Sequence, residues 1–366
     1  MKSKNIKDSF DNRLPMLPDN FLLLENAKAS KGIPKDFQSH FENRIFVHAR
    51  EELLKSFSKS EQYPDTFEMV LPHGANIGLP VVNSERSSPE KIRTAITSQR
   101  NLEGFRPEWI DYAPHPKLAP LVSKIARTRK GELIETHDNG VFGADDRQVY
   151  HPTGYPWTCV GKLYIWDDFS KPDPQGSGSA VLVGDRVILT AGHAIPWHSK
   201  NWALKFVPAY YDGASTLGNG VYSWVSDCHG YDDPGGAFDM AVCRLYKPLG
   251  KSMGYFGAKT YDSDWEGGHY WTLAGYPGAI ANANRPSRQM WWPILDDESH
   301  GDADELKYKA DATSGDSGGP VFGFWDKEDW PSVVGTHIGT VNNWGNIGDG
   351  GSAMVDLIIW GKKHWT

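Results

Sequence analysis

From about Gly140 onward, the sequence is a succession of short apolar runs, each ended within a few residues by Gly, Pro, Asp or Asn. No helical pattern separates these runs, and strands at this spacing are typical of an all-β barrel or sandwich. Two of the runs flank Gly184-Asp185 and predict a hairpin. We expect strands over residues 160–166, 179–183, 186–190, 202–208, 240–246, 269–273, 320–325 and 332–337, and a closing helix over 355–363.

Residues 1–139 have a different character, because charged residues are frequent, glycine is sparse and the periodic stretches are helical. Apolar residues recur at helical spacing over 35–59, and 116–129 ends in basic residues, which the dipole of a helix favours there. Ser88-Pro89 is the start signal of a third helix. The sequence therefore predicts an α-rich N-terminal segment over 1–139, followed by a β domain over 140–366.

Composition excludes several classes of function. The 366-residue chain carries a net charge of −8, which argues against a nucleic-acid binder because such proteins normally present a basic surface. No apolar run approaches a membrane span, and the longest near the start, 21–24, is also too short for a signal-peptide core. The three cysteines, Cys159, Cys228 and Cys243, allow at most one disulfide and lack metal-ligand spacing.

The stretch Gly315-Asp316-Ser317-Gly318-Gly319-Pro320 places a serine between glycines. Such a turn bends sharply and leaves the serine hydroxyl uncrowded. It can also direct backbone N–H groups, here those of Gly315 and Ser317, into one small space, and such an oxyanion hole is what acyl-transfer chemistry needs most. A glycine-rich turn alone is not specific, so the interpretation depends on a histidine and a carboxylate elsewhere.

Two further stretches supply these groups. His193 follows an apolar run that ends in small residues, and Asp239 directly precedes the run Met240-Ala241-Val242. The imidazole can take the proton of Ser317, and Asp239 can accept the Nδ1 proton of His193 and stabilise the imidazolium. Taken singly, His193 is a packed or capping histidine and Asp239 a strand-end carboxylate. In His–Asp–Ser order, together with the glycine-flanked serine, they predict a catalytic triad.

These three regions resemble the signature regions of the chymotrypsin-like (trypsin-type) serine peptidases. The resemblance implies two six-stranded β-barrels with the site in the cleft between them, within residues 140–366. It implies a hydrolase, a serine-type endopeptidase acting on proteins or peptides, with Ser317 as nucleophile, His193 as general base and Asp239 as its orienting partner. The sequence has no HExxH, phosphate loop or dinucleotide fingerprint, so we expect no metal and no organic cofactor.

A finer match points to one branch. Residues 140–147, followed by Tyr155-Pro156, resemble the mature start of secreted bacterial glutamyl endopeptidases, and Ala274-Gly275-Tyr276-Pro277-Gly278 recurs in that branch. So does a histidine two residues before a glycine, here His337 and Gly339. In that branch the histidine contacts the substrate glutamate. The resemblance therefore implies substrate binding by His337, cleavage after Glu or Asp, and an extracellular location.

Other residues leave the specificity open. Glutamyl endopeptidases place a Thr or Ser hydroxyl five residues before the nucleophile, where this chain has Ala312, with Thr313 adjacent. Asp311 stands six residues before the nucleophile, where trypsin-type enzymes keep the aspartate that selects Arg and Lys. An acid-selecting His337, with Thr313 and Gly339 nearby, and a base-selecting Asp311 are therefore both candidates for substrate binding.

Residues 1–139 end directly before the mature-start motif, which suggests a zymogen whose prosegment assists folding or blocks the cleft. Cleavage near Asn139–Gly140 would free an α-amino group, able to bind an acidic substrate side chain or to pair with Asp316. A permanent N-terminal docking domain is the alternative. For the chain as a whole, the alternatives are a catalytically silent, protease-like binding module and an esterase that shares the triad.

Overall fold

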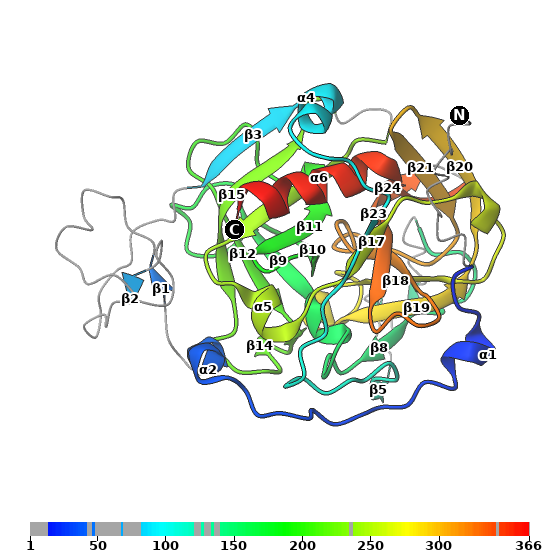
Figure 1. Cartoon of the computed structure of the whole chain (residues 1–366), viewed down its shortest axis with the longest axis horizontal. Coiled ribbons are helices and arrows are strands. Elements are labelled where there is room, and N and C mark those ends of the chain that lie inside the picture. The colour runs from blue at the N-terminus through cyan, green and yellow to red at the C-terminus, as the bar shows by residue number, and fades with distance from the viewer. Residues whose placement is uncertain are drawn as a thin grey trace, which may run out of the picture.

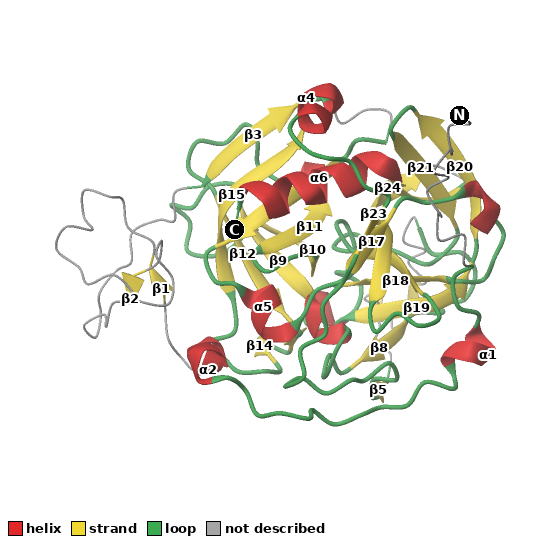
Figure 2. Ribbon diagram, in the orientation of Figure 1, coloured by secondary structure: helices red, strands yellow, loops and turns green. Residues whose placement is uncertain are grey.

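The structure is a computed structural model. It describes residues 14–41, 82–120, 140–233, 237–341 and 344–365, together with the backbone of two-residue strands at 46–47, 67–68, 126–127 and 133–134. Strands dominate the described chain (Figure 2) and form two large sheets and three small two-stranded ones. None of the described helices is both long enough and apolar enough to cross a membrane.

The first large sheet closes on itself. Its strands follow the order β12 (Ala203–Pro208), β9 (Val160–Trp166), β10 (Gly176–Leu182), β11 (Val187–Ala191), β16 (Met240–Leu245), β15 (Ser223–Tyr231) and β3 (Asn83–Ser87). Because β12 also pairs with β15, six strands form a barrel, and β3 is added outside it as a parallel neighbour of β15. β10 and β11 form the predicted hairpin.

The second large sheet surrounds a separate core. Its strands follow the order β20 (Ile294–His300), β21 (Ala303–Tyr308), β24 (Gly345–Gly350), β23 (Pro331–Val341), β22 (Pro320–Phe324), β18 (Trp271–Gly275), β19 (Ser287–Trp292), β8 (Gln148–Tyr150) and β5 (Leu118–Ala119). A side branch pairs β17 (Gly257–Lys259) with β23 and with β4 (Asn101–Leu102). Aromatic side chains dominate this core, with Trp265, Trp271, Trp325 and Tyr308 buried in it. The predicted all-β class is confirmed, and the two large sheets correspond to the two predicted barrels: the first closes with the six strands expected, whereas the second has eleven strands in the described chain.

Helix α6 (Gly351–His364) lies across both barrels (Figure 1) and contacts β11 and β16 of the first and β21 and β23 of the second. It buries an apolar stripe that includes Met354, Leu357 and Ile358, as an amphipathic helix does. The closing helix predicted over 355–363 is confirmed, and it begins four residues earlier. The shorter helical turns are η1 (Trp157–Cys159), η2 (Gly192–Ala194), α5 (Leu249–Met253), η3 (Ser263–Trp265) and η4 (Ala281–Ala283).

Helices in the N-terminal part of the described chain are short: α1 (Pro18–Phe21), α2 (Lys35–Phe41) and α4 (Pro89–Thr94). The start predicted at Ser88-Pro89 is confirmed, since the Ser88 hydroxyl accepts the Lys91 N–H at 3.3 Å. The helix predicted over 116–129 is wrong, because β5 pairs with β8 there and β6 (Ala126–Arg127) pairs with β7 (Leu133–Ile134). Of the helix predicted over 35–59, residues 35–41 form α2 and residues 46–47 form a strand, whereas 42–45 and 48–59 lie outside the described residues. The remaining small pairs are β1 (Phe46–Val47) with β2 (Phe67–Glu68), and β13 (Tyr210–Tyr211) with β14 (Ala214–Ser215).

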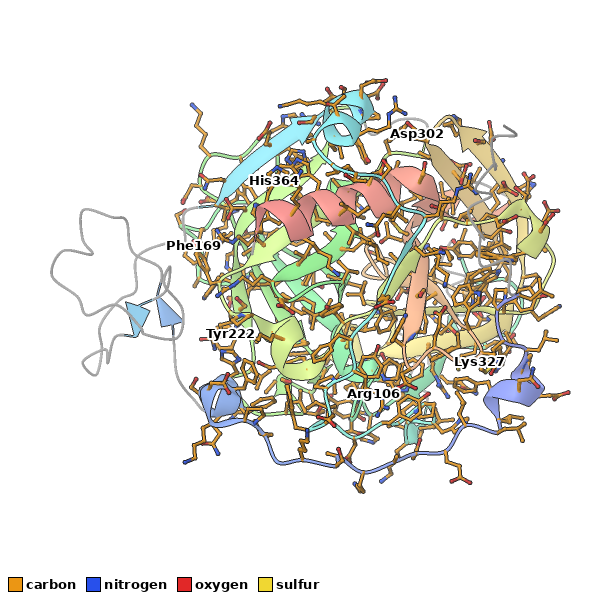
Figure 3. The ribbon with its side chains drawn as sticks, in the orientation of Figure 1. Arg106, Phe169, Tyr222, Asp302, Lys327 and His364 are labelled. Carbon is orange, nitrogen blue, oxygen red and sulfur yellow. The ribbon has the colours of Figure 1, made fainter. Side chains whose placement is uncertain are left out.

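The N-terminal part is nevertheless packed against both barrels. The strap that joins α1 to α2 runs around the outside of the molecule (Figure 1), and Phe21 and Ile92 insert into the main core with 1% exposure each. Arg93 of α4 pairs with Asp302 in the turn between β20 and β21. The Arg106 guanidinium lies 4.9 Å from the centre of the Tyr112 ring, a contact within the N-terminal part itself. Figure 3 labels both Arg106 and Asp302.

Candidate active site

His193 and Asp239 lie side by side. The Asp239 carboxylate places Oδ2 2.6 Å from His193 Nδ1, and its Oδ1 accepts the His193 backbone N–H at 2.7 Å. The bond to Asp239 raises the pKa of His193 above its usual value, against the opposing effect of burial. A carboxylate on Nδ1–H fixes the tautomer in which Nε2 is the proton acceptor. We call these two residues the dyad.

Strand pairing brings the dyad together. His193 lies in η2 directly after β11, Asp239 lies directly before β16, and Ala191 is paired with Met240 at the end of that ladder. Between them, the Gly192 N–H donates to the Asp239 carbonyl at 3.0 Å. A Cβ on Gly192 would lie only 2.7 Å from Asp239 Oδ1, so a glycine is required for the carboxylate to approach this closely.

A second carboxyl, that of Asp349 in β24, lies behind the dyad. Asp349 is fully buried, and its Oδ2 accepts the backbone N–H of Asp239 at 2.7 Å. Burial raises the pKa of Asp349 to about 8, so this carboxyl is mostly protonated at neutral pH. It therefore holds the Asp239 backbone without placing a full second negative charge beside it. No sequence pattern marks this residue, because Gly348-Asp349-Gly350-Gly351 is typical of a turn.

Ser317 lies in the loop between β21 and β22, in a turn that depends on glycines. Gly315 and Gly318 have φ of +103° and +82°, in the left-handed region that favours glycine. Within the described part of the chain, the backbone N–H groups of Gly315 and Ser317 donate no hydrogen bond. The two amides predicted to form an oxyanion hole therefore lack internal acceptors.

Ser179 of β10 fastens this turn to the first barrel. Its N–H donates to the Ser317 carbonyl and its hydroxyl to the Gly315 carbonyl, both at 2.8 Å. The Ser179 carbonyl accepts the hydroxyl of Thr190, which lies three residues before His193. The serine turn and the dyad are thus attached to the paired strands β10 and β11. Among the described residues, the half-buried Ser317 hydroxyl makes no hydrogen bond to His193, and such bonds often tighten only when substrate binds.

Asp316, next to the serine, is buried and faces a buried arginine. Its Oδ2 accepts the Thr313 N–H at 3.0 Å and lies 3.6 Å from Arg147 Nη1. Arg147 also donates to the Thr313 hydroxyl at 3.0 Å and to Asp145 Oδ2 at 2.7 Å. Burial raises the pKa of Asp316 to about 7, although Arg147 acts in the opposite direction. Asp316, considered above as the partner of a freed N-terminus, therefore has a cationic partner within the chain.

Replacing Arg147 should destabilise the fold in a pH-dependent way. Arg147→Met leaves the buried Asp316 without its cation, and breaking a buried pair in this way costs about 3–5 kcal/mol in the free energy of unfolding. In the folded protein the pKa of Asp316 is about 7, against 3.8 for a free aspartate. Folding therefore takes up a proton between these pH values, and the contribution of Asp316 to stability falls as pH rises through this window. The loss in Arg147→Met should be larger at pH 8 than at pH 5, as urea unfolding measures.

Arg285→Met is the matched control, because Arg285 pairs with Asp212 at 2.8 Å on the surface. An exposed pair contributes at most about 1 kcal/mol. Adding Asp316→Asn to Arg147→Met should restore part of the stability, since an amide needs no counter-charge. Equal losses for Arg147→Met and Arg285→Met would show that the buried pair has no special role.

His337 lies on β23 against the serine turn. Its carbonyl accepts the Gly318 N–H and its own N–H donates to the Gly319 carbonyl, both at 2.8 Å. Its Nδ1 lies 2.8 Å from the Tyr308 hydroxyl. Burial, followed by the nearby His193, lowers the pKa of His337 to about 3, so the imidazole is neutral at physiological pH.

The other candidate specificity residues differ in what they contact. Asp311 is 2% exposed, and its two carboxylate oxygens accept the backbone N–H groups of Phe142 at 2.9 Å and Asp146 at 2.8 Å. Thr313 is buried, and its hydroxyl accepts the hydrogen bond from Arg147 described above. Gly339 borders open space, because a Cβ there would meet no atom within 4 Å.

Gly140, the predicted mature start, lies between the loop that carries Ser317 and strand β24. Its carbonyl accepts the Ala312 N–H and the Asn346 side-chain amide, both at 2.9 Å. A Cβ on Gly140 would lie 2.8 Å from the hydroxyl of Thr340, near the end of β23. The five residues before it, 135–139, lie outside the described residues.

A pocket of about 600 Å³ opens beside the dyad. Ile338 of β23 and Arg86 of β3 both line it, and the Arg86 guanidinium lies 5.4 Å from the centre of the Trp197 ring. The N-terminal segment thus contributes a side chain to the surroundings of the dyad. In the described ranges, no group of three or more His, Cys, Asp or Glu side chains is arranged to hold a metal ion.

The relatives and solved structures that this chain resembles are proteases. No family model matches the chain. It is 28% identical, over 198 residues, to the glutamyl endopeptidase of Bacillus licheniformis, an alignment that covers 50% of this chain and 54% of that protein. The chain resembles the glutamyl endopeptidases. The part of this chain that aligns spans about half the length of the B. licheniformis protein.

A second relative is the extracellular metalloprotease of Bacillus subtilis, which is 22% identical over 235 residues, covering 62% of this chain and 70% of that protein. Among solved structures, a Glu endopeptidase in complex with MPD aligns with a TM-score of 0.48 and 18% identity, covering 61% of this chain and 100% of that one. A protease from Arthrobacter nicotinovorans aligns with a TM-score of 0.41 and 16% identity, over 56% and 92% of the two chains.

Proposed function

We propose that this chain is a serine endopeptidase in which Ser317, His193 and Asp239 form the catalytic triad. The observation that carries the proposal is the hydrogen-bonded dyad, together with a serine turn in which the Gly315 and Ser317 amides donate no hydrogen bond to any described residue. Ser317 Oγ attacks the scissile carbonyl while His193 Nε2 takes its proton, and the Gly315 and Ser317 amides stabilise the oxyanion. Water activated by His193 then hydrolyses the acyl-enzyme.

The substrate main chain lies along β23 as an added strand. Pairing of β22 with β23 ends at Thr336, whereas β24 continues to pair with the opposite edge of β23 as far as Val341. The edge of residues 338–341 that faces away from β24 therefore has no strand partner among the described residues. A peptide of extended conformation can satisfy these backbone groups.

Cleavage follows an acidic residue selected by His337. This proposal is supported by the position of His337 against the serine turn and by the activity for which the B. licheniformis relative is named. Asp311 is a poor ligand for a substrate Arg or Lys, because both of its carboxylate oxygens already accept backbone N–H groups. An Arg- or Lys-specific trypsin-like enzyme is therefore the second candidate.

A peptide library that varies the residue before the cut tests the specificity. We expect cleavage after Glu or Asp and little cleavage after Lys or Arg. His337→Ala should lower kcat/KM for a Glu peptide by about 10- to 100-fold, which corresponds to losing a hydrogen bond to a charged group.

The matched control is the same peptide with Gln in place of Glu. Its kcat/KM should fall less in His337→Ala than that of the Glu peptide, since a hydrogen bond from the imidazole to an amide oxygen is weaker than one to a carboxylate. A preference for Lys or Arg in the library would instead assign the selection to Asp311. Ester hydrolysis without peptide cleavage would favour the esterase. The absence of both hydrolysis and fluorophosphonate labelling would favour the silent binding module.

We propose that residues 1–139 remain part of the active enzyme. If the chain is cut near Asn139–Gly140, the two fragments stay bound to each other. Supporting this, β3, β4 and β5 are strands of the two large sheets, and Trp157 Nε1 donates to the Ala113 carbonyl at 2.8 Å. Denaturing mass spectrometry of the active protein should find either the full chain or two fragments that co-purify. Full activity in a protein that has lost residues 1–139 would instead identify a removable, inhibitory prosegment. We place the enzyme outside the cell, as the name of the B. subtilis relative states for that protein.

A further inference from the structure

Two buried cysteines face each other across adjacent strands of the first barrel. Cys228 of β15 and Cys243 of β16 are directly opposite in the antiparallel ladder, and their Sγ atoms lie 3.3 Å apart. They are 2% and 0% exposed. The third cysteine, Cys159, is also buried but lies apart from them, with its thiol 3.7 Å from the Met253 carbonyl.

We propose that Cys228 and Cys243 are joined by a disulfide in the protein that has folded under oxidising conditions. Directly opposite residues of an antiparallel pair have Cα atoms about 4.5–5.5 Å apart, and a disulfide accepts about 4.4–6.8 Å. The two thiols are already in contact. Rotation of the side chains is therefore enough to bring the sulfurs to bonding distance, without moving the backbone.

The oxidant is a disulfide of the surroundings, either a small molecule such as oxidised glutathione or the active-site disulfide of an oxidised oxidoreductase. One cysteine thiolate attacks it and forms a mixed disulfide, releasing the first thiol. The second cysteine then attacks the mixed disulfide and releases the second thiol. Two cysteine thiols are oxidised to one disulfide, and one external disulfide is reduced to two thiols, so electrons and protons balance.

Burial determines when this exchange occurs. Burial raises the pKa of the Cys228 thiol well above its usual value, which suppresses the reactive thiolate in the folded barrel. The bond therefore forms during folding, while β15 and β16 pair and before the core covers them. Once formed, the disulfide is buried in the barrel, and external thiols cannot reach it.

The bond would lie next to the strand end that carries the dyad aspartate. Asp239 directly precedes β16, and the pairing of Gly230 with Ala241 lies between Asp239 and the cysteine pair. The disulfide would close a loop of about 15 residues that contains Asp239, and closing a loop of this size stabilises the folded state mainly by restricting the unfolded chain. This inference does not depend on peptidase activity.

Thiol counting on the full chain tests the proposal. The protein is folded in a buffer of reduced and oxidised glutathione, unfolded without reductant in iodoacetamide, and its intact mass is measured. We expect one alkylated thiol, that of Cys159, and three after reduction. A non-reduced digest should contain one cross-linked species, joining the peptides of Cys228 and Cys243. Three alkylated thiols before reduction, or a cross-link that includes Cys159, would overturn the proposal.

Thermal unfolding of the oxidised wild-type chain, with and without reductant, provides a second measurement. Variants serve only as its controls. Dithiothreitol added during unfolding should lower the Tm of the oxidised wild-type chain by about 5 °C. The same reductant should leave the Tm of Cys228→Ala/Cys243→Ala unchanged, and Cys159→Ala should keep the full wild-type response. An identical wild-type Tm with and without reductant would contradict the proposal.

Discussion

Ser317→Ala should lower kcat for peptide hydrolysis by about 10⁶-fold, because removing the nucleophile leaves only substrate binding and the oxyanion-hole amides to act. The substituted side chain is small and lies in a turn held by backbone hydrogen bonds, so the fold should be retained. Peptide hydrolysis and labelling by a fluorophosphonate probe measure the effect. Wild-type protein should be labelled at Ser317, and the variant should not be labelled.

Ser314→Ala is the matched control. Ser314 lies on the same loop, three residues before Ser317, and is exposed. Its replacement should preserve labelling and turnover to within a few fold. If Ser317→Ala kept normal peptidase activity, Ser317 would not be the nucleophile and the proposed function would be wrong, as it would if the probe labelled Ser314 in place of Ser317.

Asp239→Asn should lower kcat/KM by about 10⁴-fold, because the amide can present a donor to Nδ1 and so stabilise the wrong tautomer of His193. It also removes the negative charge that stabilises the imidazolium. Since the Asp239 carboxylate raises the pKa of His193, that pKa should fall in the variant. The base must be neutral to accept a proton, so activity rises as pH rises through the pKa of His193. The acid limb of the pH profile should therefore move to lower pH.

Asp232→Asn tests whether the effect is specific, because Asp232 is an exposed aspartate in the same connection between β15 and β16. It should leave both the rate and the acid limb unchanged. A loss of rate in Asp239→Asn with an unshifted acid limb would indicate that Asp239 supports the loop rather than the imidazole.

Local sequence signals predicted the elements whose causes are local. The helix that begins at Pro89 was predictable because Ser88 caps it and proline suits its first turn. The hairpin of β10 and β11 was predictable because its two strands are adjacent in the sequence. Residues 116–129 show why the same reasoning fails elsewhere. Their helical periodicity is overridden by the pairing of β5 with β8, and strand pairing outweighs intrinsic preference where the partner lies far along the chain.

The chemical part of the site could be predicted from the sequence in the same way. The serine turn, His193 and Asp239 each occur in a short, characteristic stretch, and their order along the chain indicates their roles. Ser179, Arg147 and Asp349 could not be assigned roles, because each acts through a partner more than 100 residues away. Only folding shows that they fasten the serine turn, face Asp316 and hold the backbone of Asp239.

The sequence by itself thus determined the reaction class that we propose and the all-β class, because glycine positions and strand periodicity are properties of short stretches, and the resemblance to the chymotrypsin-like peptidases implied the two barrels. The tertiary structure decided how the site is supported and which specificity residue remains a candidate. The sequence left both Asp311 and His337 as candidates for substrate binding. Both residues are buried, and what distinguishes Asp311 from His337 is that each of its carboxylate oxygens already accepts a backbone N–H group, that of Phe142 or of Asp146.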